Sequence, residues 1–217
     1  MILQNNLGVG ISGRQAGPIL GSIVRALKTS LFVLFAGTMA AVSLSIAQSD
    51  ADAPPPRDGQ HDFDFAFGGW KTHVSRLLHP LTGSNTWAEY DGTHVIRKIW
   101  DGKANLGELE ADGPAGRIEA MSPRLYNPDT RQWSIRYGNP HDGVLGKPVI
   151  GEFMADGHGE FYGQETVNGR EVLVREVYTP VSPNTRKLEI AYSADGGKTW
   201  ETHWKMTDTK IANYQNP

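Results

Sequence analysis

Dipeptides that favour tight turns recur at short intervals along this chain and divide it into pieces of the length of β-strands. Asp-Gly and Asn-Gly supply the positive φ angles that two-residue hairpin turns require, and Pro fixes the first turn position. Adjacent pieces should therefore pair in an antiparallel manner, and about ten strands are expected. The turn signals lie at residues 90–92, 101–102, 113–116, 127–129, 156–157, 168–169, 182–184 and 195–197.

Side chains within these pieces alternate in character. From Trp133 to Tyr137, and again from Trp200 to Met206, every second residue is bulky and mostly apolar. A period of two is typical of strands. A meander of hairpins that closes on itself leaves no exposed edge, so we predict an all-β fold consisting of a single antiparallel up-and-down β-barrel. A barrel of about eight to ten strands has room for side chains or for one small ligand.

The N-terminal part of the chain differs from the rest. Its first 47 residues contain no Asp or Glu, and their only charges are Arg14, Arg25 and Lys28. An apolar run then ends in small residues just before Gln48. A basic segment followed by an apolar run and small residues is typical of a secretory signal peptide, which places the mature protein in the periplasm or outside the cell.

We therefore predict four segments in the chain. They are a signal peptide over residues 1–47, a Pro-rich linker over 48–60, a β-barrel over 61–212 and a tail over 213–217. An uncleaved N-terminal anchor is the alternative for the first segment, because its apolar run approaches the roughly 20 residues that span a bilayer. Within the barrel segment, residues 61–67 could form a short helical plug before the first strand.

Charge and cysteine content limit the partners of the protein. The formal net charge is −3, and the sequence contains no run of Lys or Arg. This balance argues against nucleic acid and against anionic lipid surfaces, so we predict no membrane contact beyond the signal segment. The absence of cysteine excludes disulfides and thiol catalysis. The oligomeric state does not follow from the sequence.

Several segments resemble a known family. Gly68-Gly69-Trp70 matches the Gly-x-Trp that opens the first strand of lipocalin-like proteins, where the Trp closes one end of the barrel. Together with residues 87–89, 125–133 and 192–201, it resembles an uncharacterised bacterial family of lipocalin-like barrels of the cell envelope. The resemblance covers residues 61–211. It implies the calycin-type fold of lipocalins and fatty-acid-binding proteins, and it brings no established activity.

A second motif, Ser193-x-Asp195-x-Gly197-x-Thr199-Trp200, fits the Asp-box pattern of sialidases and propeller proteins. Its Ser and Asp side chains hydrogen-bond the backbone of a turn, so the motif stabilises a hairpin without contacting a substrate. Propellers repeat the box in each blade, whereas this chain has it once. The motif therefore indicates a hairpin rather than a glycosidase.

Arginines among apolar residues indicate a polar anchor inside the barrel. Arg97 and Arg175 have apolar neighbours two positions away, so we expect both guanidinium groups to point inward. A buried guanidinium commonly binds a carboxylate of the protein or of an acidic ligand. An internal salt bridge or an outer position is the alternative. The predicted ligand-binding residues are Trp87, Arg97, Trp100, Trp133, Tyr137, Arg175 and Tyr178.

The leading functional hypothesis is an exported barrel that binds a small hydrophobic molecule, and the arginines would suit a ligand with an acid group. The second is a barrel enzyme, an isomerase, hydratase, cyclase or decarboxylase, with Glu89, Glu165 or His94 as general acid or base. Familiar hydrolase, zinc-protease and phosphate-loop motifs are absent from the sequence, which favours the non-enzymatic hypothesis. The third is a structural or interaction module of the cell envelope, with a filled barrel.

The seven histidines do not have the spacing of a metal site. His203 alternates with Trp204 and is expected on the solvent side, with Glu201 and Lys205. Nitrobindin-like barrels bind haem through a histidine near the chain end, but their glycine-rich opening is not reproduced after Trp70. We therefore predict neither a cofactor nor a metal.

Overall fold

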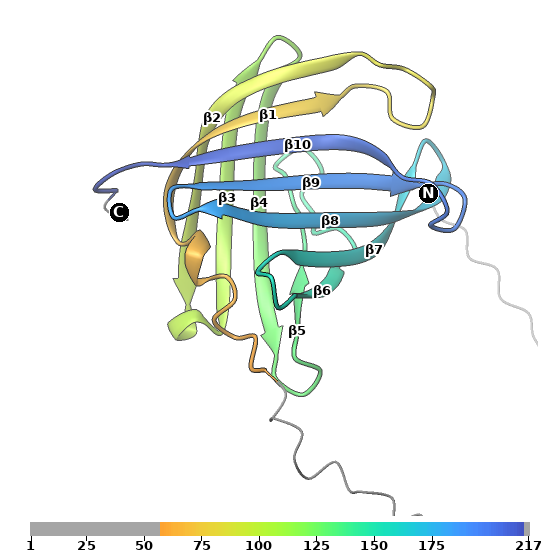
Figure 1. The fold of residues 1–217 in the computed structure, drawn as a ribbon. Helices are drawn as coiled ribbons and strands as arrows, with labels where there is room; N and C mark the ends of the chain where they lie inside the picture. Colours follow the sequence, from red (N-terminus) through yellow and green to blue (C-terminus); the bar gives the residue numbers. More distant parts are fainter. Residues whose placement is uncertain (1–56, 215–217) are drawn as a thin grey trace, which may run out of the picture. The chain divides into compact units, whose positions relative to one another are not determined.

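A computed structural model describes residues 57–214 (Figure 1). Ten antiparallel strands form a closed barrel in which each strand pairs with the next along the chain and the last pairs with the first. The predicted all-β barrel is confirmed. The strands are β1 (Gly68–Leu77), β2 (Trp87–Ile99), β3 (Ala104–Gly113), β4 (Gly116–Asn127), β5 (Gln132–Ile135), β6 (Val149–Phe153), β7 (Gly159–Val167), β8 (Arg170–Ser182), β9 (Thr185–Ser193) and β10 (Glu201–Lys210).

Two short 3-10 helices, η1 (Asp64–Ala66) and η2 (Trp100–Gly102), accompany the strands. No helix within residues 57–214 is long and apolar enough to cross a membrane. The predicted signal peptide lies outside the described residues, as do most of the linker and the end of the tail. Those segment boundaries therefore remain predictions.

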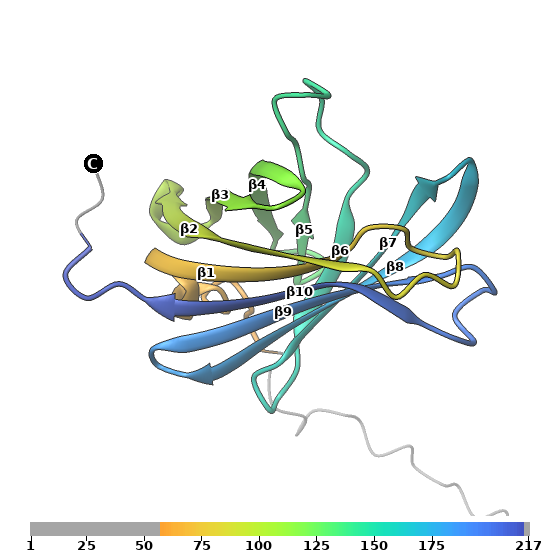
Figure 2. The same ribbon diagram turned by 90° about the horizontal axis from the view of Figure 1, so that it is seen from above.

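The predicted turns produce the hairpins of the barrel. Between β7 and β8, Asn168 and Gly169 have φ angles of 51° and 75°, as a two-residue hairpin turn requires. Between β9 and β10, the Asp195 carboxylate accepts hydrogen bonds from the backbone of Lys198 and Thr199 at 3.0 and 2.9 Å. The Asp box therefore stabilises a turn, and Figure 2 shows the long hairpins wrapping around the barrel.

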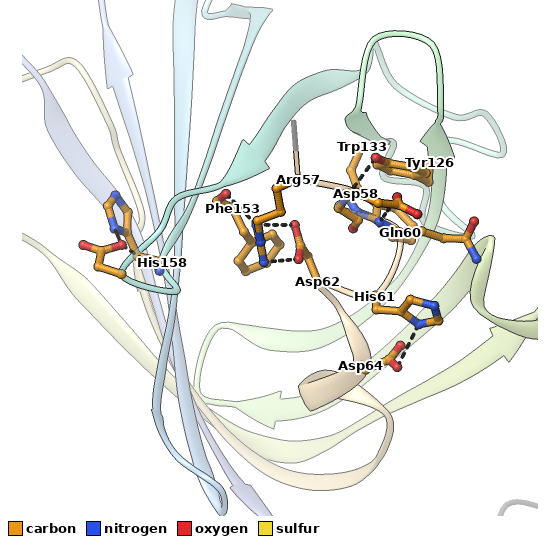
Figure 3. A network of polar contacts seen from close by, with 12 residues as sticks. Arg57, Asp58, Gln60, His61, Asp62, Asp64, Tyr126, Trp133, Phe153 and His158 are labelled. Carbon is orange, nitrogen blue, oxygen red and sulfur yellow. Dashed lines mark hydrogen bonds and ion pairs between the residues drawn. The ribbon is translucent and has the colours of Figure 1, made fainter. Parts of the chain in front are cut away.

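A segment preceding β1, residues 57–67, plugs one end of the barrel. The buried ring of Phe63 packs edge-on against Trp133 and Phe153, with centroid distances of 5.0 and 4.9 Å. Trp133 Nε1 donates a hydrogen bond to the Gly59 carbonyl at 2.9 Å. Figure 3 shows this segment against the barrel, with Arg57 paired to Asp62. This end of the barrel is therefore filled by packed aromatic side chains.

Trp70, at the start of β1, completes the plugged end. Its indole Nε1 donates to the Ala66 carbonyl at 2.9 Å, which fixes η1 beside the first strand. The guanidinium of Arg186 lies 4.3 Å from the ring centroid, within cation–π range. The Trp of the Gly-x-Trp motif thus lies at the barrel end that the resemblance implies.

A β-bulge interrupts the alternation in β10. Thr202 pairs with Ala191 and Trp204 pairs with the adjacent Ile190, so His203 is the extra residue. A bulge inserts one unpaired residue and changes which side chains face inward. The solvent-side prediction for His203 is wrong for this reason, because His203 and Trp204 both line the interior.

Candidate ligand-binding site

The barrel contains a cavity of about 430 Å³. Its mouth lies opposite the plug, because Arg76 at the end of β1 and His203 at the start of β10 both line it, as does the loop around His141. The volume lies within the range of small-molecule sites. The apolar part of the wall comes from Leu109, Ile118, Ala120, Leu188, Ile190, Trp204 and Met206.

Arg124 of β4 brings a positive charge to the floor of this cavity. Its side chain is buried, with 2% of the residue exposed, and Nη1 donates to Asn105 Oδ1 at 3.0 Å. The guanidinium also lies 5.1 Å from the centroid of the Phe63 ring. No carboxylate among residues 57–214 forms an ion pair with it. A buried charge is costly unless it is paired, so an unpaired guanidinium here is suited to bind an anionic group.

Gly107 in β3 lets polar side chains pack closely beside this guanidinium. A Cβ atom on Gly107 would lie 2.5 Å from Ser122 Oγ, 3.1 Å from His94 Nε2 and 3.3 Å from Arg124 Nη1. Any larger residue at this position would therefore clash with polar atoms that line the cavity. Three polar groups from β2 and β4, the strands on either side of β3, converge at this point.

His94 belongs to a buried polar set that also contains Asp208 and Arg186. Arg186 donates from Nε and Nη2 to Asp208 Oδ2, at 2.9 and 2.6 Å, and His94 Nδ1 lies 3.1 Å from the same oxygen. Burial lowers the pKa of His94 to about 4, and the hydrogen bond to Asp208 only partly offsets this effect. His94 is therefore neutral, and the charges of the other two side chains compensate each other.

Glu176 of β8 is the second unusual group of the floor. Its Oε2 atom lies 2.7 Å from the Tyr137 hydroxyl and 3.2 Å from the Tyr178 hydroxyl, which are 2.9 Å apart. Burial raises the pKa of Glu176 to about 7, because the two tyrosines and the charge of Arg124 offset desolvation only in part. The pKa of Tyr137 is raised well above its ordinary value, mainly by burial. Near neutral pH the carboxyl group is therefore present in both its protonated and its ionised form, while the tyrosine hydroxyls remain neutral hydrogen-bond donors.

The mouth of the cavity is polar and aromatic. Tyr192 donates its hydroxyl to Glu165 Oε2 at 2.8 Å, and the His203 ring stacks on Tyr192 with a centroid distance of 3.7 Å. Burial, followed by the charge of Arg76, lowers the pKa of His203 to about 4. His203 is therefore an uncharged aromatic wall near neutral pH.

The structure brings some predicted site residues together. Tyr137, Glu165 and His94 line the cavity. Trp133 and Tyr178 are buried, but Trp133 packs against the plug and Tyr178 acts through its hydroxyl contacts with Glu176 and Tyr137. Whether any of them binds a ligand remains a prediction.

The inward orientation predicted for Arg97 and Arg175 is wrong. In β2 the inward positions belong to His94 and Ile96, so Arg97 lies outside and pairs with Glu108. In β8 the inward position belongs to Glu176, and the guanidinium of Arg175 lies over the ring of Trp200, outside the barrel. A shift of one residue reverses every face of a strand.

Three further residues predicted to face the cavity, Trp87, Glu89 and Trp100, lie outside it. Trp87 and Glu89 lie on the outer face of β2, where Glu89 accepts a hydrogen bond from Ser75 and Lys205 lies over the Trp87 ring. Trp100 falls in η2 and is 70% exposed, so it cannot shape a cavity.

Arg124, Ser122 and Glu176 are the site residues that the sequence analysis missed. Glu176 alternates with Arg175 in a strand where both faces carry apolar residues, so the alternation alone did not place it inside. Arg124 had no usable signal. The outer face of β4 carries the exposed apolar residues Met121 and Leu125, while its inner face carries Ser122 and Arg124, which reverses the usual pattern.

No group of three or more His, Asp or Glu side chains in the described part of the chain could hold a metal ion. The site is instead an apolar cavity with a cationic floor and a carboxyl group beside it. The closed meander of ten antiparallel strands that contains it is a lipocalin-like barrel in its fold.

No protein-family model matches the sequence, and no curated protein matches it. The fold is similar to that of the S-type phycobiliprotein lyase CPES from Guillardia theta, with a TM-score of 0.51 and 13% identity. That match covers 73% of this chain and 95% of the lyase. The structure of EF1p2_mFAP2b bound to DFHBI overlaps with a TM-score of 0.39 and 10% identity, over 70% of this chain and 99% of the other. These similarities concern the fold alone.

Proposed function

We propose that this protein is an exported lipocalin-like barrel that binds a small, largely apolar carboxylic acid. The observation that carries the proposal is Arg124, a buried guanidinium that lines an apolar cavity and lacks an ion-pair partner among residues 57–214. The predicted signal peptide, residues 1–47, supports export to the periplasm or beyond. The segments that resemble envelope barrels of bacteria support the same location.

The geometry indicates how such an acid would lie. Its carboxylate would approach Arg124 and Ser122, which both line the cavity. Charge-assisted hydrogen bonds are strong in such a buried setting. Its apolar body would extend along the wall formed by residues such as Leu188 and Met206, towards the mouth. The ligand would then supply the ion-pair partner that Arg124 lacks among residues 57–214.

The cavity also bears on the alternatives. A purely structural module with a filled barrel would have no need for an internal volume of about 430 Å³. An enzymatic role is favoured by one specific observation, the carboxyl group of Glu176, which lines the cavity and is held at Oε2 by two tyrosine hydroxyls.

Isothermal titration calorimetry tests the proposal with a matched pair of probes. We expect phenylbutyric acid to bind more tightly than its neutral amide, because only the acid is attracted by Arg124. Arg124→Gln should weaken binding of the acid by about tenfold to a hundredfold, the usual worth of a charge-assisted hydrogen bond, and leave the amide unaffected.

The matched control is Arg97→Gln, the same substitution on the outer face of the barrel. It should leave both affinities unchanged. The proposal is wrong if the acid and its amide bind equally, or if Arg124→Gln and Arg97→Gln have the same effect. Circular dichroism of each variant shows whether the fold is retained.

A further inference from the structure

The carboxyl group of Glu176 is held at one oxygen and free at the other. Oε2 is fixed by the hydroxyls of Tyr137 and Tyr178, at 2.7 and 3.2 Å. Oε1 accepts no hydrogen bond from residues 57–214, and Glu176 lines the cavity. A carboxylate that is held in one orientation with a free oxygen has the geometry of a general base.

The surroundings suit this role. Glu176 is 1% exposed, and burial raises its pKa to about 7, where a carboxylate is a stronger base than in water. Arg124 lies close enough to oppose this rise through its charge, and its guanidinium lies 6.0 Å from the Tyr178 ring centroid. A positive charge beside a base can stabilise negative charge that develops on a bound substrate.

These features restrict the substrate class. A base of this strength removes a proton from carbon only where the resulting carbanion is stabilised, as it is beside a carbonyl group. The wall around Leu109, Ile190 and Met206 is apolar, which favours an apolar ketone.

We propose that the cavity catalyses proton transfer at the carbon beside the carbonyl group of a small apolar ketone, with Glu176 as the catalytic base. The carbon–hydrogen bond breaks and the proton moves to Oε1. The electron pair of that bond forms a carbon–carbon double bond, and the carbonyl oxygen takes the negative charge of an enolate that faces Arg124. Return of a proton from Glu176 to the far carbon of a conjugated system gives isomerisation. If the proton on Oε1 first exchanges with solvent water, its return to the same carbon gives hydrogen exchange.

Tyr137 has a distinct, positioning role in this reaction. Its hydrogen bond to Oε2 directs Oε1 towards the substrate and lowers the pKa of Glu176. This activity goes beyond the binding of an acid, and it requires only that a ketone enter the cavity.

The test is hydrogen–deuterium exchange of β-tetralone and benzylacetone with the full chain in heavy water. Proton NMR follows loss of the signals beside the carbonyl, and quenching of tryptophan fluorescence measures binding. We expect exchange that becomes faster as pH rises through the pKa of Glu176. Glu176→Gln should slow exchange by about a hundredfold or more. Glu189→Gln, the same substitution at an exposed position of β9, should not change it.

Tyr137→Phe separates positioning from a purely structural role. It should leave measurable exchange and move the midpoint of the pH profile upward, since the lost hydrogen bond lowers the pKa of Glu176. Equal rates in the wild type and Glu176→Gln overturn the inference. Binding of either ketone without exchange overturns it too, as does failure of both ketones to bind. None of these results affects the binding of acids, which calorimetry measures independently.

Discussion

The raised pKa of Glu176 makes a quantitative prediction about stability. Its ordinary value is 4.5, and burial raises the pKa to about 7 in the folded protein. The folded state therefore binds the proton more tightly than the unfolded state. Below pH 4.5 the group is protonated in both states and does not lower the free energy of unfolding. As pH rises from there through the folded value, the free energy of unfolding decreases by about 3 kcal/mol, since each pKa unit is worth about 1.4 kcal/mol.

Glu176→Gln removes this effect while keeping the shape of the side chain and an acceptor for the tyrosine hydroxyls. Other groups also titrate, and His94 acts in the opposite direction because its pKa is lowered to about 4. The informative quantity is therefore the difference in unfolding free energy between variant and wild type. That difference should change in favour of the variant by about 3 kcal/mol from about pH 4 to about pH 8.

Urea unfolding followed by far-ultraviolet circular dichroism measures this difference at a series of pH values. Glu189→Gln, on the exposed face of β9, is the control and should show no pH-dependent difference. A flat difference for Glu176→Gln would refute the reasoning about burial. A difference of opposite sign would mean that the charge of Arg124 outweighs desolvation.

Three further predictions concern the cavity and the Asp box. Binding of phenylbutyric acid should weaken as pH rises through about 7, because ionised Glu176 then repels the carboxylate. Binding of the amide should not change over this range. Calorimetry would contradict the account if the affinities of both compounds changed with pH, or if neither did. Gly107→Ala should lower the free energy of unfolding in urea by about 1–3 kcal/mol and prevent binding of the acid, since the new Cβ meets Ser122 Oγ. The double variant Gly107→Ala with Ser122→Ala should regain part of the stability and part of the acid affinity. Asp195→Ala should lower the midpoint of thermal unfolding without altering acid affinity; an altered affinity would show that the hairpin contributes to the site.

The strand count and topology could be predicted because turn chemistry is local. Asn168-Gly169 and the Asp195 box produce hairpins wherever they occur, and consecutive hairpins leave few alternatives to a closed meander. The position of Trp70 at the end of the barrel followed instead from the resemblance of Gly68-Gly69-Trp70 to the opening of lipocalin-like proteins.

The inner faces could not be predicted with equal success, because they depend on register. Arg97 and Glu176 lie in strands where both faces carry apolar residues, so alternation alone does not decide which face is inside. Arg124 faces inward from β4, whose outer face carries the exposed apolar residues Met121 and Leu125. His203 is turned inward by a bulge that has no sequence signal. A cavity with a charged floor departs from the simple pattern at the residues that form the site.

The identity of the molecule held by the protein tests the central claim most directly. Protein purified from its own host compartment would be extracted with organic solvent, and the extract analysed by mass spectrometry, for the wild type and for Arg124→Gln. The account predicts a small apolar carboxylic acid in the wild-type extract and its loss in the variant. An extract without such an acid, or with equal amounts of it from both proteins, would contradict the account.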